Sequence, residues 1–145
     1  MMAFLMFCFV SAAAAETTVR FKPWELKWVP NRSIPPGVEM SVIYGDPSKT
    51  GPFIIRVRFP ANYRLPPHIH PDTRNVTVLS GTYFAAEGEQ FDRDKLIAFP
   101  PGGFYTNPAG VPHYAMTGPS ETMIQEGGTG PSAIHYINAA DDPRR

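Results

Sequence analysis

Two histidines of this chain have a spacing that suits a metal site. His68 and His70 are separated by one residue in the stretch PPHIHP. On an extended chain such a pair projects to one face, where two neutral imidazoles can converge on a transition metal. An H-x-H pair also occurs as ordinary surface or core histidines, so the pair alone leaves both interpretations open.

A third histidine strengthens the metal interpretation. His113 follows the turn sequence PAGVP and begins an apolar segment. A proline–glycine turn that leads directly into a strand fixes the direction in which His113 enters a sheet. The fourth histidine, His135, has no such context, and we expect it on an outer face or at an interface.

The two histidine stretches resemble the paired motifs of the cupin superfamily, G(x)5HxH(x)3-4E(x)6G and G(x)5PxG(x)2H(x)3N. The resemblance implies an all-β fold with a single cupin barrel, also called a double-stranded β-helix or jelly roll. It further implies one divalent transition metal bound by the three histidines. The matched positions are His68, His70 and Gly81 in the first motif, and Gly102, Pro108, Gly110 and His113 in the second.

Three positions depart from these motifs. Asn62 replaces the first glycine, a mild change because asparagine tolerates the left-handed backbone that glycine usually serves. Thr117 replaces the final asparagine, at a position we expect to be structural. Arg74 stands where the motif has its metal-binding glutamate, and only Asp72 and Asn75 offer oxygen donors nearby.

Arg74 leaves three interpretations open, because a guanidinium cannot bind a cation. It could extend to solvent, pair with the carboxylate of a bound ligand, or mark a chain that has lost metal binding. If the metal is retained, three neutral imidazoles suit Fe, Cu, Zn, Ni or Mn and leave positions open for substrate. An inward guanidinium would favour an anionic ligand.

The rest of the composition agrees with a small β-barrel. Seventeen prolines and twelve glycines among 145 residues argue against long helices and favour short strands joined by turns. One helical turn is expected within 90–95. Strands are expected at 19–27, 38–44, 53–59, 76–80, 82–87, 96–99, 103–106, 113–117, 122–126 and 133–138.

The first fifteen residues differ from those that follow. They carry no charge, contain an apolar run and end in small residues before Glu16, as in the later part of a secretory signal peptide. We therefore expect residues 1–15 to be a signal peptide, residues 16–145 to form one cupin domain, and the product to be periplasmic or secreted. Cys8, the only cysteine, falls within the signal.

Charge and surface features bear on partners. The formal net charge is zero, which gives no reason to expect capture of nucleic acid or, after processing, of a membrane. Trp24 and Trp28 would share one face of the first expected strand, and that apolar stripe could cover a barrel edge or pair with a second copy in a homodimer.

The expected function is that of an exported small cupin metalloprotein acting on a small organic or sugar-like ligand. Open positions at a three-histidine site favour a mononuclear metal-dependent oxidoreductase of the dioxygenase type; the alternative is a non-catalytic ligand-binding or sensing cupin with a structural or absent metal. No catalytic residue is assigned. The candidate substrate-binding residues are Arg74, Asn75, Tyr83, Tyr105 and Gln125.

Overall fold

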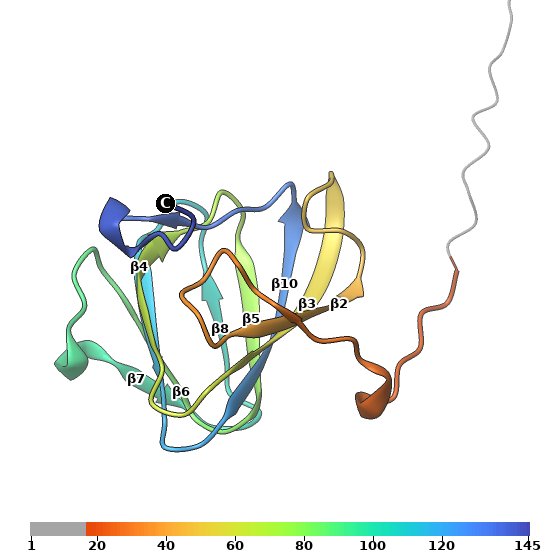
Figure 1. Ribbon diagram of the computed structural model, residues 1–145, viewed down its shortest axis with the longest axis horizontal. Coiled ribbons are helices and arrows are strands. Elements are labelled where there is room, and N and C mark those ends of the chain that lie inside the picture. The colour runs from red at the N-terminus through yellow and green to blue at the C-terminus, as the bar shows by residue number, and fades with distance from the viewer. Residues whose placement is uncertain (1–16) are drawn as a thin grey trace, which may run out of the picture.

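A computed structural model describes residues 17–145, so the signal-peptide interpretation concerns residues outside the described part of the chain. Two antiparallel sheets form a barrel (Figure 1), which confirms the all-β fold expected from the sequence. The first sheet has the order β1 (Val29–Pro30), β2 (Glu39–Tyr44), β3 (Gly51–Phe59), β10 (Thr122–Gly130), β5 (Arg74–Ser80) and β8 (Phe104–Asn107). The second has the order β11 (His135–Tyr136), β4 (Arg64–Ile69), β9 (His113–Thr117), β6 (Tyr83–Glu87) and β7 (Ile97–Phe99).

The core follows from the period of two along the central strands. In β3, Phe53, Ile55, Val57 and Phe59 are all buried, while the residues between them are more exposed. Such alternation turns one face of a strand to the core. The neighbouring β10 pairs with β3 on one side and β5 on the other, so its inward residues lie at the middle of the sheet.

The strand that carries the first histidines was not expected from the sequence, because Pro66 and Pro67 interrupt its pattern. Proline cannot donate to a ladder and is found at strand edges and bulges. The pairing of β4 with β9 indeed shifts register between Leu65 and His68, and this irregularity accommodates both prolines.

The strand expected at 19–27 is not formed, and that prediction was wrong. The segment contains a 3-10 turn, η1 (Pro23–Glu25), and lies off the barrel (Figure 1), where no strand of the described chain pairs with it. Trp24 is 78% exposed, whereas Trp28 packs against the Arg58 guanidinium at 4.5 Å. The two tryptophans therefore form no common stripe on a strand.

Other local expectations are closer to the structure. A second 3-10 turn, η2 (Arg93–Lys95), lies within the expected helical turn, and a third, η3 (Ala139–Asp141), follows β11. Asn62 has a φ of 55°, the left-handed conformation expected for it. The Thr117 hydroxyl donates to the Pro60 carbonyl at 2.7 Å and accepts from the Tyr63 amide, which confirms its structural role.

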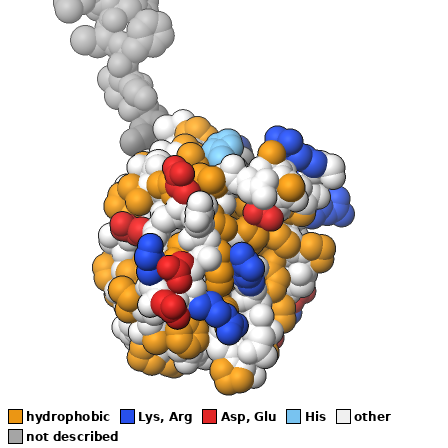
Figure 2. All heavy atoms as spheres, turned by 90° about the vertical axis from the view of Figure 1, so that its left-hand side faces the viewer, with side chains coloured by type: hydrophobic (Ala, Val, Ile, Leu, Met, Phe, Trp, Pro, Cys, Tyr) orange, Lys and Arg blue, Asp and Glu red, His pale blue; other side chains and the backbone are white. Residues whose placement is uncertain are grey.

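One face of the molecule shows acidic and basic side chains interspersed among apolar ones (Figure 2). None of the helical segments among residues 17–145 has the length and apolar character needed to cross a membrane.

Candidate metal centre

The fold brings His68, His70 and His113 together. His68 lies near the end of β4 and pairs directly with His113, the first residue of β9, while His70 follows just beyond the strand. One ring nitrogen from each histidine lies within 4.8 Å of the others, and all three side chains are buried. This is the N-donor set that a divalent transition metal prefers.

Backbone carbonyls fix the tautomer of each ring. The Nδ1 atoms of His68, His70 and His113 lie 2.8, 2.7 and 2.9 Å from carbonyl oxygens of Pro66, Ala133 and Val111. A carbonyl only accepts, so each Nδ1 carries the proton and each Nε2 keeps its lone pair. At His70 the Arg74 Nη2 also lies 3.5 Å from Nδ1, but the contact to the Ala133 carbonyl is the much shorter one and decides the tautomer. Such second contacts orient the ligands of metal sites in proteins.

The Nε2 atoms have the properties that metal binding requires. The Nε2 of His113 is buried and has no hydrogen-bond partner among the described residues. Burial, and to a smaller extent the nearby Arg74 charge, lowers the pKa of all three imidazoles; that of His70 falls to about 3. The rings are therefore neutral near pH 7, and a metal can bind without displacing protons. The residues present fit a divalent transition metal.

These lowered pKa values predict an acid-sensitive apoprotein. The unfolded histidines bind protons below their ordinary pKa of 6.5, whereas the folded ones do not, so stability falls as the pH drops below that value. For His70, with a folded pKa of about 3, the loss between pH 7 and pH 5 is about 2 kcal/mol, and His68 and His113 act in the same direction. Urea unfolding of metal-free protein at pH 7 and pH 5 measures this loss of stability. Replacement of the exposed His135 by glutamine is the control; equal stability at pH 7 and 5 would contradict the prediction.

A small cavity opens beside the three histidines. Its volume is about 150 Å³, below the roughly 300–1,000 Å³ of pockets that hold drug-sized molecules. Its wall combines apolar side chains from both sheets with a few polar ones. The polar lining includes His68, His70, His113, Arg74, Tyr83, Asn107, Glu126 and Ser132.

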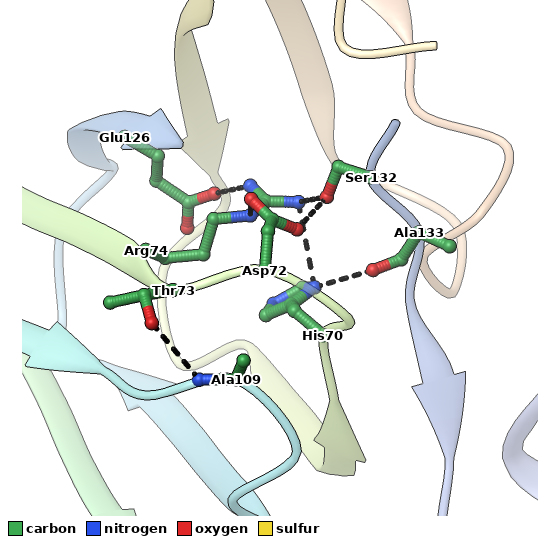
Figure 3. Close-up of polar contacts among 8 residues, drawn as sticks. All are labelled: His70, Asp72, Thr73, Arg74, Ala109, Glu126, Ser132 and Ala133. Atoms are coloured by element: carbon green, nitrogen blue, oxygen red, sulfur yellow. Dashed lines mark hydrogen bonds and ion pairs between the residues drawn. The ribbon is translucent and has the colours of Figure 1, made fainter. Parts of the chain in front are cut away.

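Arg74 points inward and is held by its own chain (Figure 3). Its Nη1 donates to Glu126 Oε2 at 2.8 Å, and its Nη2 donates to Ser132 Oγ at 2.6 Å. Its Nε forms an ion pair with Asp72 Oδ2 at 3.0 Å, although the angle is too poor for a hydrogen bond. The Ser132 hydroxyl donates in turn to Asp72 Oδ1, which closes the cluster.

This cluster answers the question that Arg74 raises in the sequence. The residue is 5% exposed, so the interpretation in which it extends to solvent is wrong. One guanidinium faces two carboxylates, Asp72 and Glu126, so the three side chains sum to one negative charge when both carboxylates are ionised. No guanidinium edge is left for a ligand carboxylate, and the expected preference for an anionic ligand does not follow.

Two glycines of β10 allow a matched test of how tightly this cluster packs. A Cβ on Gly128 would collide with the Asp72 carboxylate and lie 2.8 Å from the Phe53 ring, whereas one on Gly127 would meet nothing closer than 3.7 Å. We expect Gly128→Ala to lower the free energy of unfolding by about 1–3 kcal/mol through overpacking, and Gly127→Ala to change it by less than about 1 kcal/mol. Urea unfolding of both variants measures the difference, and equal effects would contradict the packing.

The structure separates the candidate substrate-binding residues. Arg74 and Tyr83 line the cavity, and Tyr105 stacks on Tyr83 with ring centroids 6.2 Å apart. Asn75 is exposed beside the buried Arg74, and Gln125 accepts a hydrogen bond from Arg56 at 3.1 Å. Neither Asn75 nor Gln125 lines the cavity.

Glu126 is a cavity residue that the sequence interpretation missed, as are Asn107 and Ser132. Thr122 and Ile124 are buried, and Glu126 continues their alternation toward the inside of the barrel, whereas Gln125 belongs to the other face. Burial raises the pKa of the Glu126 carboxyl, and the Arg74 charge acts against that rise. The period of two along β10 was the signal that could have identified Glu126.

The jelly-roll barrel and the three convergent histidines define a cupin with a candidate mononuclear metal site. The sequence profile of the ChrR cupin-like domain matches residues 16–133. The protein therefore belongs to the ChrR cupin-like family, which confirms the resemblance seen in the sequence. Comparison with curated proteins finds no match.

Solved structures share the fold at low sequence identity. The polyketide cyclase RemF from Streptomyces resistomycificus is 18% identical, with 88% of this chain and 90% of that chain covered and a TM-score of 0.73. KdgF from Halomonas sp. is 18% identical, with 79% and 96% covered and a TM-score of 0.61. The DMSP lyase DddQ from Ruegeria pomeroyi is 17% identical, with 79% and 63% covered and a TM-score of 0.61.

Proposed function

We propose that this protein is a metal-dependent cupin enzyme that acts on a small organic or sugar-like molecule. One divalent transition metal is held by His68, His70 and His113. The observation that carries the proposal is the buried Nε2 of His113, which lacks a partner while all three Nδ1 protons are bound by carbonyls. An imidazole kept neutral, oriented and unpartnered beside a cavity is suited to binding a metal.

The reaction class we propose is that of an oxidoreductase. Bound iron or copper would supply redox chemistry at this site. The three imidazoles contribute no charge, and no carboxylate joins their ligand group among the described residues, which leaves room for a substrate atom. The apolar wall, which includes Ile55, Leu65 and Ile134, limits the access of water to the bound molecule.

Oxygen consumption tests this reaction class. Protein loaded with Fe(II), Cu(II) or Zn(II) is incubated with a panel of small alcohols, phenols and sugars in an oxygen electrode. Uptake with iron or copper, absent with zinc and in His113→Ala, supports the oxidoreductase. A protein that binds its ligand with any of the metals but turns none over fits the non-catalytic alternative instead.

A second candidate is a metal enzyme that moves protons without redox chemistry. The observation in its favour is that Glu126 and Tyr83 share the cavity with the histidines. A carboxylate can accept a proton and a neutral phenol can donate one, and burial raises the pKa of Tyr83 so that it stays protonated. The solved cyclase and lyase show that this fold also carries reactions of other kinds. Turnover with zinc and without oxygen would favour this candidate.

Export and a homodimer remain part of the proposal. The composition of residues 1–15 supports export, which mass spectrometry of the N-terminus of the mature protein tests. Val19, Phe21 and Trp24 are exposed on the segment that lies off the barrel, which supports burial of this segment against a second copy. Sedimentation equilibrium of the mature chain and of a variant with Trp24→Ser tests the dimer; a monomer in both would overturn it.

A further inference from the structure

The cavity contains one carboxylate oxygen that the protein leaves free. Glu126 Oε2 accepts the hydrogen bond from Arg74, and no contact within residues 17–145 engages Oε1. In Figure 3 a dashed line joins the first oxygen to the guanidinium, and none reaches the second oxygen. Glu126 lines the cavity, and its side chain is 14% exposed, so Oε1 is accessible from the cavity rather than sealed in the core.

The position of this oxygen is fixed by the cluster behind it. Arg74 is itself held by Asp72 and Ser132, and its guanidinium lies 5.0 Å from the centre of the Phe53 ring. A planar guanidinium with several partners has little freedom to rotate. The carboxylate that it holds is therefore presented to the cavity in one orientation, as a site that recognises a particular ligand group requires.

The surroundings of Glu126 show which ligand group it suits. Tyr83 lines the same cavity, and Tyr105 stacks on Tyr83. Burial, with a contribution from the Glu126 charge, raises the pKa of both phenols, so both are neutral. The Arg74 cluster offers no free cationic edge for an anion. A free carboxylate oxygen accepts hydrogen bonds, and a hydroxyl group donates one without bringing a charge into the barrel.

We propose that Glu126 is a specificity-determining residue whose Oε1 accepts a hydrogen bond from a hydroxyl group of the ligand. The ligand class is a small uncharged molecule that carries an O–H donor, of a size that suits a cavity of about 150 Å³. This inference rests on the proposed function, which places the ligand in the same cavity. The cupin motif places a metal-binding carboxylate at position 74 of β5. In this chain the carboxylate of the cavity is Glu126 on β10, and we assign it to the ligand instead of the metal.

Phenol and fluorobenzene provide a matched pair of probes. They are nearly equal in size and shape, but only phenol can donate a hydrogen bond. Dissociation constants are measured by two-dimensional NMR titration of zinc-loaded protein, and the zinc content of each sample is determined first. We expect wild-type protein to bind phenol at least tenfold more tightly than fluorobenzene, because a site that leaves a charged acceptor unpaired disfavours a ligand without a donor.

Two variants and one control assign the preference to Glu126. Glu126→Leu removes the acceptor and should abolish the preference for phenol, while Glu126→Gln keeps a neutral acceptor and should retain part of it. Glu121→Gln removes an exposed carboxylate just before β10 and should leave the preference unchanged. Should Glu126→Leu not fold, Glu126→Gln carries the assignment, because it keeps the shape of the side chain and should weaken the preference for phenol, whereas an unchanged preference in Glu126→Gln would overturn the inference.

Each outcome has a defined meaning. A preference for phenol that disappears in Glu126→Leu supports the inference. Equal affinities in wild type, binding of neither probe, or a preference that survives Glu126→Leu would overturn it. Protein that shows the preference but holds no zinc would support this inference and overturn the metal part of the proposed function. Protein that holds zinc but shows no preference would overturn this inference and leave the metal part standing.

Discussion

Replacement of Arg74 by alanine should lower the free energy of unfolding by about 3–5 kcal/mol. Arg74 and Asp72 are both nearly inaccessible to solvent, and the Glu126 side chain is largely buried as well. Removal of one partner of a buried ion pair leaves an uncompensated charge, which is the costly case. Here the loss leaves two carboxylates inside the barrel with no cation between them.

Urea unfolding at pH 7 measures this effect on metal-free protein. Arg56→Ala serves as the control, because within residues 17–145 the Arg56 side chain hydrogen-bonds to Gln125 alone, on the outer face of the sheet, and its loss should change the free energy of unfolding by less than about 1 kcal/mol. If the two arginine variants have the same stability, the buried cluster does not contribute as described. The substitution Arg74→Glu, which the motif would suggest as a repair, should be no milder than Arg74→Ala because it adds a third carboxylate.

Zinc should stabilise the wild-type protein strongly. A metal that binds only the folded state raises the free energy of unfolding by about 4 kcal/mol when its free concentration is 1,000 times the dissociation constant. Because the three Nε2 atoms are already deprotonated and oriented, binding should need no rearrangement of the rings. Thermal or urea unfolding with and without zinc measures the shift.

The histidine variants show where the zinc acts. The double variant His68→Ala/His113→Ala should lose this stabilisation, since a single imidazole remains of the three-histidine group. His135→Ala should keep it, because His135 is exposed on β11 and outside the group. A zinc effect that is equally large in the double variant would place the metal elsewhere.

Much of the site could be predicted because motif spacing carries it. The residues between His68 and His113 include four glycines with positive φ, where other residues would be strained. Three of them are motif positions: Gly81 at 72°, Gly102 at 86° and Gly110 at 74°. A sequence pattern records such turns directly. The barrel fold could therefore be predicted from the motif spacing, even though Pro66 and Pro67 concealed the strand β4.

What could not be predicted depends on contacts between distant strands. Arg74 and Glu126 are 52 residues apart and meet only because β5 and β10 are neighbours in one sheet. With that pairing unknown, position 74 looked like an unpaired cation. The prediction of a strand at 19–27 was wrong for a related reason. Alternating apolar residues form a stable strand where a partner strand is available, and no strand of residues 17–145 pairs with this segment.

The most direct test of a metal-binding cupin site is the metal-to-chain ratio of protein purified without a histidine tag. Elemental analysis after incubation with Fe, Cu, Zn, Ni or Mn salts and removal of excess metal should give one ion per chain for at least one of them, and none for His68→Ala/His113→Ala. A ratio near zero for wild-type protein with every metal, or an equal ratio in the double variant, would contradict a metal held by His68, His70 and His113.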